Sequence, residues 1–254
     1  MISSELYPMI FKRKSFHLFR NCGDEHISDA ELSEIKSAWE SFEPLCPEIR
    51  TAIRIIPASK VAFKRDAEYC VLVYSEQKTN WLQNVGYLGQ QLDLWLTSKN
   101  IGSLWFGIGK PDEPTFEGLS YVIMFAVRKV PDETQFRKDM YAAKRKPMEE
   151  IWEGDALDAA EVARFSPSAC NSQPWKVENR DGKLTVYRYT KNTRIGIMSP
   201  KNAQYFNRID IGIYLCILEL CLQHEGKTFT RTLFPDDPGD EAELTRVAEY
   251  SAGR

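Results

Sequence analysis

Two helical segments of this chain are apolar on nearly every face, and they constrain the fold more than any other feature. The segment 84–99 carries Val85, Leu88, Leu92, Trp95 and Leu96, and the segment 207–223 has the same character. A surface helix has one apolar stripe, whereas a helix that is apolar nearly all round is buried. The simplest arrangement that buries both segments packs them against each other in one core.

These two helices also correspond to each other in sequence. Asn84-Val-Gly86 matches Asp210-Ile-Gly212, which follows it by 126 residues, and three leucines in each helix keep that spacing. Upstream, Phe42-Glu-Pro44 matches Phe165-Ser-Pro167 at a spacing of 123 residues. Two helices with similar packing roles could share leucines by chance, but the additional matches favour a tandem duplication. The chain is then equivalent to a homodimer whose two copies are joined.

Each half has the same expected order of helix, two strands, buried helix and strand. Ser28 and Glu31 have the spacing of a capping box, and an amphipathic helix follows that ends before Pro44. The first half has strand patterns at 49–56, 69–74 and 120–128; the second has a helix at 157–165, a turn at 180–182 and strands at 175–178, 183–189 and 228–234. The predicted fold class is α+β, with two tandem repeats, 1–143 and 144–254, in one compact pseudo-dimer.

Composition excludes several classes of protein. The chain has 254 residues with 33 Lys and Arg against 36 Asp and Glu, so no excess positive charge favours nucleic acid. No apolar run approaches the ~20 residues of a membrane span, and the N-terminus lacks the pattern of a signal peptide. We therefore expect a cytoplasmic protein that binds neither membrane nor nucleic acid.

The cysteines and histidines give no metal-binding pattern. The six cysteines include no C-x-x-C pair, and the three histidines lie far apart. Cys216 and Cys221 fall inside the second apolar helix, where free cysteines behave as small hydrophobic residues. We expect neither a metal site nor a disulfide framework.

Two short segments have the residues of a binding site. Arg13, Lys14, Ser15 and His17 form a basic cluster with a hydroxyl, which can hold a phosphate or simply face solvent. The segment 166–175 joins a helix to a strand and is turn-rich and nearly uncharged. Its polar side chains at 168, 171 and 173 suit hydrogen bonding to a flat polar heterocycle.

These residues resemble the FMN-dependent nitroreductase superfamily. The segment 163–175 is similar to its signature A-x-x-A-P-S-x-x-N-x-Q-P-W, and residues 13–17 resemble its N-terminal R-R-S-x-R element. The segment 101–107 is similar to its G-x-G-S/T-x-W-x-G element, and 144–151 to the basic R-K-P-L/M-E-E element that closes a subunit. The resemblance runs from about residue 11 to about residue 230. The order of the elements looks like the fused, two-repeat branch of the superfamily.

The resemblance implies that FMN lies between the two repeats. It assigns the phosphate, the ribitol and the pyrimidine edge to Arg13, Lys14, Ser15, His17, Arg145 and Lys146. It assigns one side of the isoalloxazine ring to Pro167, Ser168, Asn171 and Gln173 of the second repeat. It assigns the other side to Leu104, Trp105 and Gly107.

Two departures from the family pattern affect the expected site. His17 replaces the final cation of R-R-S-x-R, which usually faces the N1/O2 edge of the flavin. The resemblance therefore does not define the reduction potential of the flavin. In the first repeat, Leu45, Glu48 and Arg50 stand where the second repeat has its three polar ring-binding residues. We therefore expect one of two duplicated sites to be lost, leaving one FMN per chain.

The implied function is an oxidoreductase that passes electrons from NAD(P)H through FMN to a nitroaromatic, a quinone or a similar small acceptor. The cofactor carries the chemistry, so no side chain need act as a nucleophile. Two alternatives stay open: a flavin-binding protein without turnover, and a relic without cofactor. The loop 191–203 is expected to form part of the pocket wall. Because the two apolar helices satisfy each other within one chain, we expect a monomer.

Overall fold

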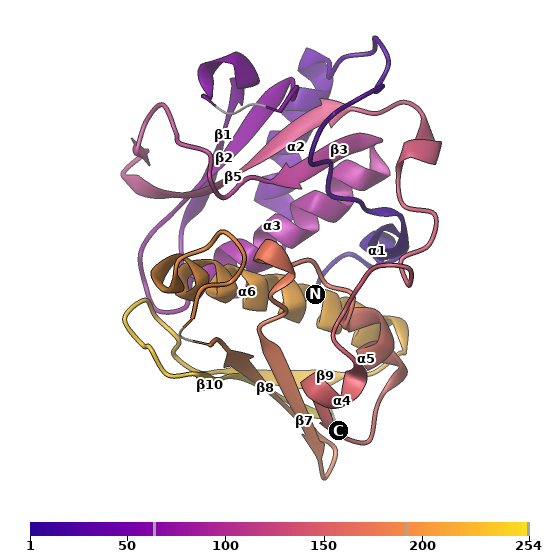
Figure 1. The fold of residues 1–254 in the computed structure, drawn as a ribbon, viewed down its shortest axis with the longest axis vertical. Helices are drawn as coiled ribbons and strands as arrows, with labels where there is room; N and C mark the ends of the chain where they lie inside the picture. Colours follow the sequence, from indigo (N-terminus) through magenta and orange to yellow (C-terminus); the bar gives the residue numbers. More distant parts are fainter. Residues whose placement is uncertain (63–64, 192, 253–254) are drawn as a thin grey trace.

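Two long helices cross at the centre of the molecule, between two β-sheets at opposite ends (Figure 1). This is seen in a computed structural model that describes residues 1–62, 65–191 and 193–252. The helices are α3 (Trp81–Ser98) and α6 (Pro200–His224), which contain the two apolar segments and pack against each other. Cys216 and Cys221 are buried in α6, as the sequence predicted.

The first half of the chain forms a sheet with the strand order β1-β2-β5-β3, and β4 pairs with β5. The strands are β1 (Thr51–Pro57), β2 (Tyr69–Ser75), β3 (Ile101–Trp105), β4 (Thr115–Phe116) and β5 (Leu119–Lys129). The short helices and helix around these strands are η1 (Ser4–Leu6), α1 (Met9–Lys12), α2 (Asp29–Ser41) and η2 (Ala58–Lys60), with η3 (Glu133–Gln135) after β5. Helix α2 begins at the predicted capping box, where Ser28 and Glu31 each accept a hydrogen bond from the other's backbone N–H.

The second half forms a sheet with the order β6-β7-β8-β10-β9. Its elements are α4 (Met148–Ile151), β6 (Trp152–Gly154), α5 (Asp158–Ala163), η4 (Ala169–Asn171), β7 (Trp175–Arg180), β8 (Lys183–Tyr189), β9 (Phe229–Leu233) and β10 (Leu244–Ala252). Asp181 and Gly182 have φ values of 52° and 73°, which close the predicted β7–β8 hairpin. The prediction of an α+β fold is confirmed.

The two sheets have the same strand order when strands are matched by their place in each half. β1, β2, β5 and β3 correspond to β7, β8, β10 and β9, and β6 is an additional edge strand that pairs in parallel with β7. The pairs β1–β2, β2–β5 and β3–β5 are antiparallel, as are β7–β8, β8–β10 and β9–β10. Each half therefore offers the central helices a sheet of the same topology.

The helices cross where a glycine of each meets the backbone of the other. A Cβ atom on Gly86 would lie 2.0 Å from the carbonyl oxygen of Ile209, and one on Gly212 would lie 1.9 Å from that of Gln83. Gln83 and Ile209 each precede the glycine of their own helix by three residues, so the contact is reciprocal. Only glycine allows this approach, because any side chain would collide with the opposing carbonyl.

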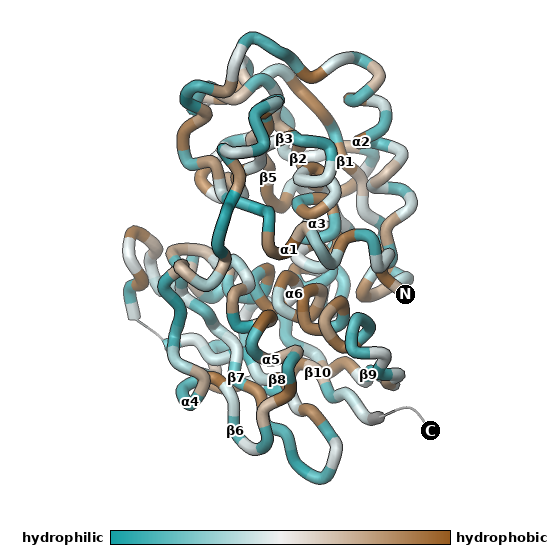
Figure 2. Tube along the Cα trace, turned by 90° about the vertical axis from the view of Figure 1, so that its right-hand side faces the viewer, coloured by the Kyte–Doolittle hydropathy of each residue, from teal (hydrophilic) through white to brown (hydrophobic). Residues whose placement is uncertain are grey.

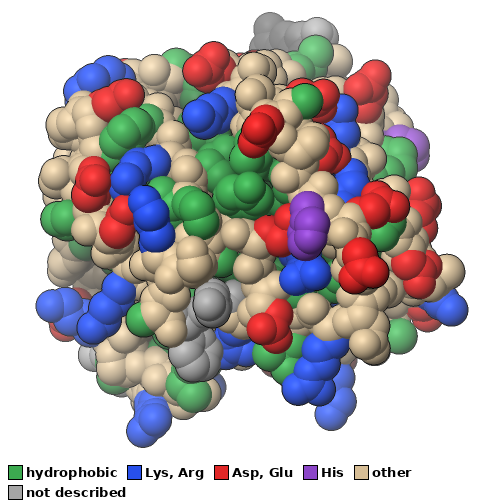
Figure 3. Space-filling view, turned by 90° about the horizontal axis from the view of Figure 1, so that it is seen from above, with side chains coloured by type: hydrophobic (Ala, Val, Ile, Leu, Met, Phe, Trp, Pro, Cys, Tyr) green, Lys and Arg blue, Asp and Glu red, His purple; other side chains and the backbone are tan. Residues whose placement is uncertain are grey.

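The two sheets differ in how they are covered. The main core surrounds α3 and α6 and reaches both sheets; Figure 2 shows hydrophobic residues concentrated along α6 and β5. The first sheet also carries a second apolar cluster. Along β2, Val71 and Val73 belong to the main core, whereas the alternate residues Leu72 and Tyr74 belong to this second cluster. Seen from above, over the first half, hydrophobic side chains gather near the centre among charged ones (Figure 3).

Some element boundaries differ from the sequence expectation. Helix α6 begins at Pro200 rather than at 207, because Ser199 caps it by accepting a hydrogen bond from the N–H of Asn202 and proline occupies the first turn. The predicted loop 191–203 is therefore shorter, and its residue 192 lies outside the described residues. The sequence patterns also missed β3 and β10; β10 has a register shift between Arg246 and Ala248 that breaks the alternation.

Candidate functional site

A cavity of about 280 Å³ lies between the two halves, beside the helix crossing. Seven of the thirteen site residues predicted from the sequence line it: Ser15, His17, Leu104, Trp105, Gly107, Pro167 and Ser168. Helix α6 adds four residues that the sequence reasoning missed: Phe206, Ile209, Asp210 and Ile213. Ile197, Met198 and Asn202, from the segment predicted as a pocket wall, also line the cavity. The first five of the seven come from the first half and the other two from the second, so the cavity is shared.

Trp105 forms one wall at the end of β3. Its indole fits against α3 only because position 89 is glycine, where a Cβ atom would lie 2.5 Å from the ring. The ring packs against Phe125 with centroids 4.2 Å apart. The indole Nε1 is buried and donates to no described residue. Trp105 thus contributes a flat apolar surface and a free donor, which suit an aromatic ligand with acceptor atoms.

The N-terminal segment is held against β3. Ser15 forms a bridge with Ser103, and the Nη2 atom of Arg13 donates to the Ser15 hydroxyl at 3.0 Å. The Nε atom of Arg13 lies 2.8 Å from Oδ2 of Asp93, a buried carboxylate of α3 that also accepts from the Ser103 hydroxyl. Arg13 is therefore buried beneath the cavity rather than lining it, and its charge is partly balanced by Asp93.

Lys14 and His17 are exposed on the same segment. Lys14 donates from Nζ to the carbonyl oxygen of Gln135 at 2.7 Å and does not line the cavity. His17 lines the cavity, and its carbonyl oxygen accepts from Nη1 of Arg65 at 3.1 Å. Of this predicted basic cluster, Ser15 and His17 face the cavity.

The polar loop before β7 folds back on the segment 144–146. Asn171 accepts a hydrogen bond at Oδ1 from Nη1 of Arg145 at 3.0 Å, and Gln173 accepts at Oε1 from the N–H of Lys146 at 2.7 Å. Ser168 accepts at Oγ from the N–H of Gln173 at 3.0 Å. Asn171 and Gln173, with φ values of 55° and 48°, thus contact Arg145 and Lys146, and none of these four lines the cavity.

Arginines gather next to this loop. Burial, together with the charges of Arg137, Arg13 and Arg164, lowers the pKa of Arg145 to about 10. Burial and the charge of Arg13 likewise lower the pKa of the half-buried Arg137, which the sequence reasoning missed. The Nε atom of Arg145 is buried and has no hydrogen-bond partner in the described chain. Guanidinium groups that repel one another, with one hydrogen-bond donor left without an acceptor, suit the binding of an anion such as a phosphate.

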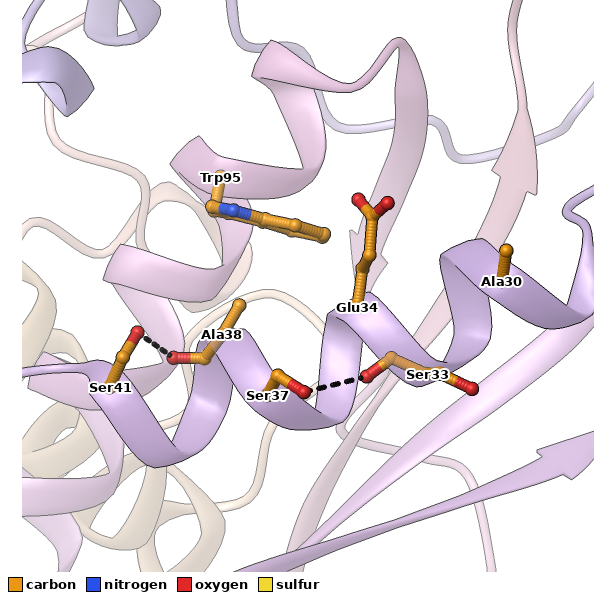
Figure 4. A pocket seen from close by; sticks show the side chains of 7 residues that line it. All are labelled: Ala30, Ser33, Glu34, Ser37, Ala38, Ser41 and Trp95. Carbon is orange, nitrogen blue, oxygen red and sulfur yellow. Dashed lines mark hydrogen bonds between the residues drawn. The ribbon is translucent and has the colours of Figure 1, made fainter.

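A second hollow lies on the outer face of α2, beneath Trp95 (Figure 4). Its polar residues are mostly serines whose hydroxyls already bond to carbonyls of their own helix: Ser33 to Asp29, Ser37 to Ser33 and Ser41 to Ala38. It therefore offers few free polar groups, and the cavity between the halves is the stronger candidate.

A family model described as "Putative TM nitroreductase" matches residues 5–222. The chain belongs to this nitroreductase family. The fold is similar to that of a "putative nitroreductase" from Thermotoga maritima MSB8, with a TM-score of 0.60, 18% identity, and coverage of 96% of this chain and 92% of that one. A nitroreductase family protein from Clostridium difficile 630 matches with a TM-score of 0.43 and 16% identity, covering 62% of this chain and 100% of that one. No curated protein matches the chain in sequence.

In this nitroreductase-family protein, four of the residues missed from the sequence lie on α6. Phe206, Ile209, Asp210 and Ile213 follow the helical spacing of 3, 1 and 3 residues on one face of α6. The correspondence of Asn84 with Asp210 was a usable signal, because it placed an acid where the matching helix has a neutral amide. Within the described ranges, no group of three His, Cys, Asp or Glu residues could hold a metal, and no helix is long and apolar enough to cross a membrane.

Proposed function

We propose that this protein is an FMN-dependent oxidoreductase that takes electrons from NAD(P)H and passes them to a nitroaromatic, a quinone or a similar small acceptor. The observation that carries the proposal is a cavity that both halves line, with an aromatic wall, beside a cluster of arginines that has fewer carboxylates than arginines. FMN combines the same two features, a flat ring and a phosphate. The family membership supports an oxidoreductase independently of this geometry.

The unpaired donors fit this cofactor. Trp105 has a buried free donor at the cavity, where a ring carbonyl or nitrogen can accept it, and Arg145 has one in the arginine cluster. We assign the phosphate to Arg13, Arg145, Lys146 and Lys14, and the ribitol and pyrimidine edge to Ser15 and His17. We assign the ring to Leu104, Trp105, Gly107, Pro167 and Ser168, with Asn171 and Gln173 behind them. When bound, the flavin supplies hydride acceptance and donation.

The chain's own residues bind, orient and exclude water. Ile123, Phe206 and Ile213 give the cavity an apolar lining that excludes water from a bound ring. Ile108 and Ile197 line the cavity and are 53% and 72% exposed, so they form an apolar rim where NAD(P)H and the acceptor can approach.

We also propose that the chain is a monomeric pseudo-dimer of two repeats, 1–143 and 144–254, with one FMN. The equal strand order of the two sheets and the reciprocal glycine contact support a duplication. The helix face that a dimer would use is already covered within the chain. Light scattering should give a mass close to 29.3 kDa, and a stable dimer that persists on dilution would contradict this.

The visible absorbance spectrum of the purified protein, with and without added FMN, tests the cofactor. Flavin bands that elute with the protein, at one equivalent of FMN released per chain on denaturation, are expected. Oxidation of NAD(P)H in the presence of a quinone or a nitroaromatic then tests turnover. Bound flavin without this oxidation would favour the alternative, a non-catalytic flavin-binding protein; failure to bind FMN would overturn the proposal.

A further inference from the structure

Asp210 is a buried acid that lines the cavity. It lies on α6 and is 3% exposed. Its Oδ1 atom accepts from the N–H of Ala169 at 3.0 Å, and its Oδ2 atom lies 3.2 Å from the hydroxyl oxygen of Ser172. The carboxyl group therefore fixes the loop before β7 to the central helix, while the same side chain borders the cavity.

The hydrogen bonds around Asp210 are all satisfied when its carboxyl group carries a proton. The Ser172 hydroxyl lies within hydrogen-bond distance of two acceptors, Oδ2 of Asp210 and Oδ1 of Asn207, the latter at 3.0 Å. The Asn207 amide nitrogen donates to Thr190, so its oxygen faces Ser172. One hydroxyl proton serves one of these acceptors. Both contacts are satisfied when Asp210 carries a proton and donates to Ser172, which then donates to Asn207.

The charges near Asp210 agree with a protonated acid. Burial raises its pKa to about 8, against the hydrogen bonds from Ala169 and Ser172, which lower it. The titratable groups that share the cavity are His17, Arg65 and Cys170. No ion pair joins Asp210 to a cation in the described part of the chain. On its own helix, Arg208 turns toward Asp236 and the carbonyl oxygen of Asp240. The α3 residues at the crossing, Gln83 and Gly86, are neutral.

Asn84 is an internal control for this acid. It occupies the position of α3 that corresponds to Asp210, and its Oδ1 atom accepts from the N–H of Cys46 at 3.0 Å. This is the same anchoring contact that Asp210 makes with Ala169, made by a neutral amide. Anchoring the loop therefore does not require an acid. The acid is present on the helix that borders the cavity and absent from its counterpart.

We propose that Asp210 donates a proton to the electron acceptor bound in this cavity. This inference rests on the proposed function. Reduction of a quinone to a hydroquinone needs two electrons and two protons; one proton arrives with the electron pair as hydride, which originates from the reduced nicotinamide. In this step the O–H group of Asp210 leaves Ser172, its O–H bond breaks and its proton bonds to the second quinone oxygen. The carboxylate then takes a new proton from water at the rim.

The pH dependence of stability tests whether Asp210 holds the proton. In the unfolded chain the carboxyl ionises near pH 4, whereas the folded protein keeps the proton up to about pH 8. Folding takes up a proton in this window, so the stability that protonated Asp210 contributes is fully present below about pH 4 and is lost as the pH rises to about 8. Asp210→Asn has the shape and the donor of the protonated acid but takes up no proton.

We therefore expect Asp210→Asn to melt at a higher temperature than the wild type at pH 8, with a difference that shrinks toward pH 5. The exposed carboxylate Glu48, changed to Gln, should give no such pH-dependent difference. A difference between Asp210→Asn and wild type that is the same at pH 5 and at pH 8, zero included, would show that the folded protein does not hold the proton on Asp210, which would overturn the proposal. This measurement needs no turnover, so it remains informative if FMN binding, and with it the proposed function, fails.

Quinone reduction tests whether the proton is used. With FMN affinity within about threefold of the wild type, Asp210→Asn should lower the turnover number roughly 100-fold or more. The wild-type rate should fall above about pH 8, and the variant should lose that limb of the profile. Wild-type turnover in Asp210→Asn, with an unchanged pH profile, would overturn the donor role even if the stability test succeeds.

Discussion

The two sides of the helix crossing have corresponding residues, but one side holds a cavity and the other is filled by polar side chains. On one side, α6 borders the cavity; on the other, the matching positions of α3 are covered by protein. Asn80 accepts at Oδ1 from the N–H of Asp236 at 2.9 Å, and Gln83 donates to the carbonyl of Asp236 at 2.7 Å. Tyr87 donates to Glu219 at 2.6 Å. A polar network fills the region where the other side holds open space.

Arg231 completes this network. It stands on β9 at the position that corresponds, at the spacing of 126 residues, to Trp105 on β3. Its Nη1 atom lies 2.7 Å from Glu219, and its Nη2 atom donates to the carbonyl oxygen of Leu45 at 3.2 Å. Leu45 in turn corresponds to Ser168 of the cavity. The side with the polar network therefore stabilises the fold, whereas the side with the cavity has fewer packing contacts.

The largest expected effect comes from the two arginines paired with corresponding acids, Asp93 and Glu219. Arg13→Ala and Arg231→Ala each leave a buried carboxylate without its cation, which should lower the free energy of unfolding by about 3–5 kcal/mol. Urea denaturation measures this. Arg13→Ala should also weaken FMN binding roughly 10- to 150-fold through a lost charge-assisted hydrogen bond, in a fluorescence titration. Weakened FMN binding in Arg231→Ala alone would reverse the assignment of the two sides.

The next effect concerns the crossing itself. Gly86→Ala and Gly212→Ala each force a methyl group into an opposing carbonyl, so each should lower the free energy of unfolding by about 1–3 kcal/mol or more. Because the contact is reciprocal, we expect similar losses, measured by thermal or urea unfolding. Ser37→Ala on the exposed face of α2 is the control and should change little. A loss in only one glycine variant would show that the crossing is not symmetric.

The sequence predicted the central helices well because burial leaves a direct record in residue type. The apolar residues of α3 and α6 predicted that the two helices pack against each other, which the structure confirms. The capping box at Ser28 predicted the start of α2 for a different reason, because a local pair of hydrogen bonds specifies it. The strand pattern at 228–234 also predicted β9 (Phe229–Leu233) to within one residue at each end, whereas β3 and β10 were missed.

The candidate site was harder to predict, because a motif gives residue types and not directions. Ser15 and His17 of the N-terminal motif line the cavity, but the motif could not show that Arg13 turns inward to Asp93. Asn171 and Gln173 bond to the segment 144–146 instead of lining the cavity, which only the fold of the loop determines. Arg137 joins the arginine cluster through tertiary proximity and belongs to no motif.

A smaller effect should follow from loosening this loop. Asn171→Ala removes an acceptor of Arg145 and leaves its guanidinium less well oriented. A hydrogen bond of this kind contributes about 0.5–3 kcal/mol, and the exposed position of Asn171 favours the low end, so FMN affinity should fall less than in Arg13→Ala. The flavin spectrum should shift if the loop contacts the ring. A loss of affinity greater than that of Arg13→Ala would make the loop, and not the buried arginine, the main phosphate holder.

The smallest effect is expected at Glu48, on the filled side. Its side chain is exposed, and its backbone carbonyl accepts a hydrogen bond from Nζ of Lys78 at 2.8 Å, a contact that persists in Glu48→Ala. Stability should therefore change by no more than about 0.5 kcal/mol, and FMN affinity and stoichiometry should stay the same. If the filled side instead held a second FMN, removing a carboxylate near an anionic cofactor would strengthen binding. A rise above one equivalent of FMN per chain in Glu48→Ala would show that this side is open in solution.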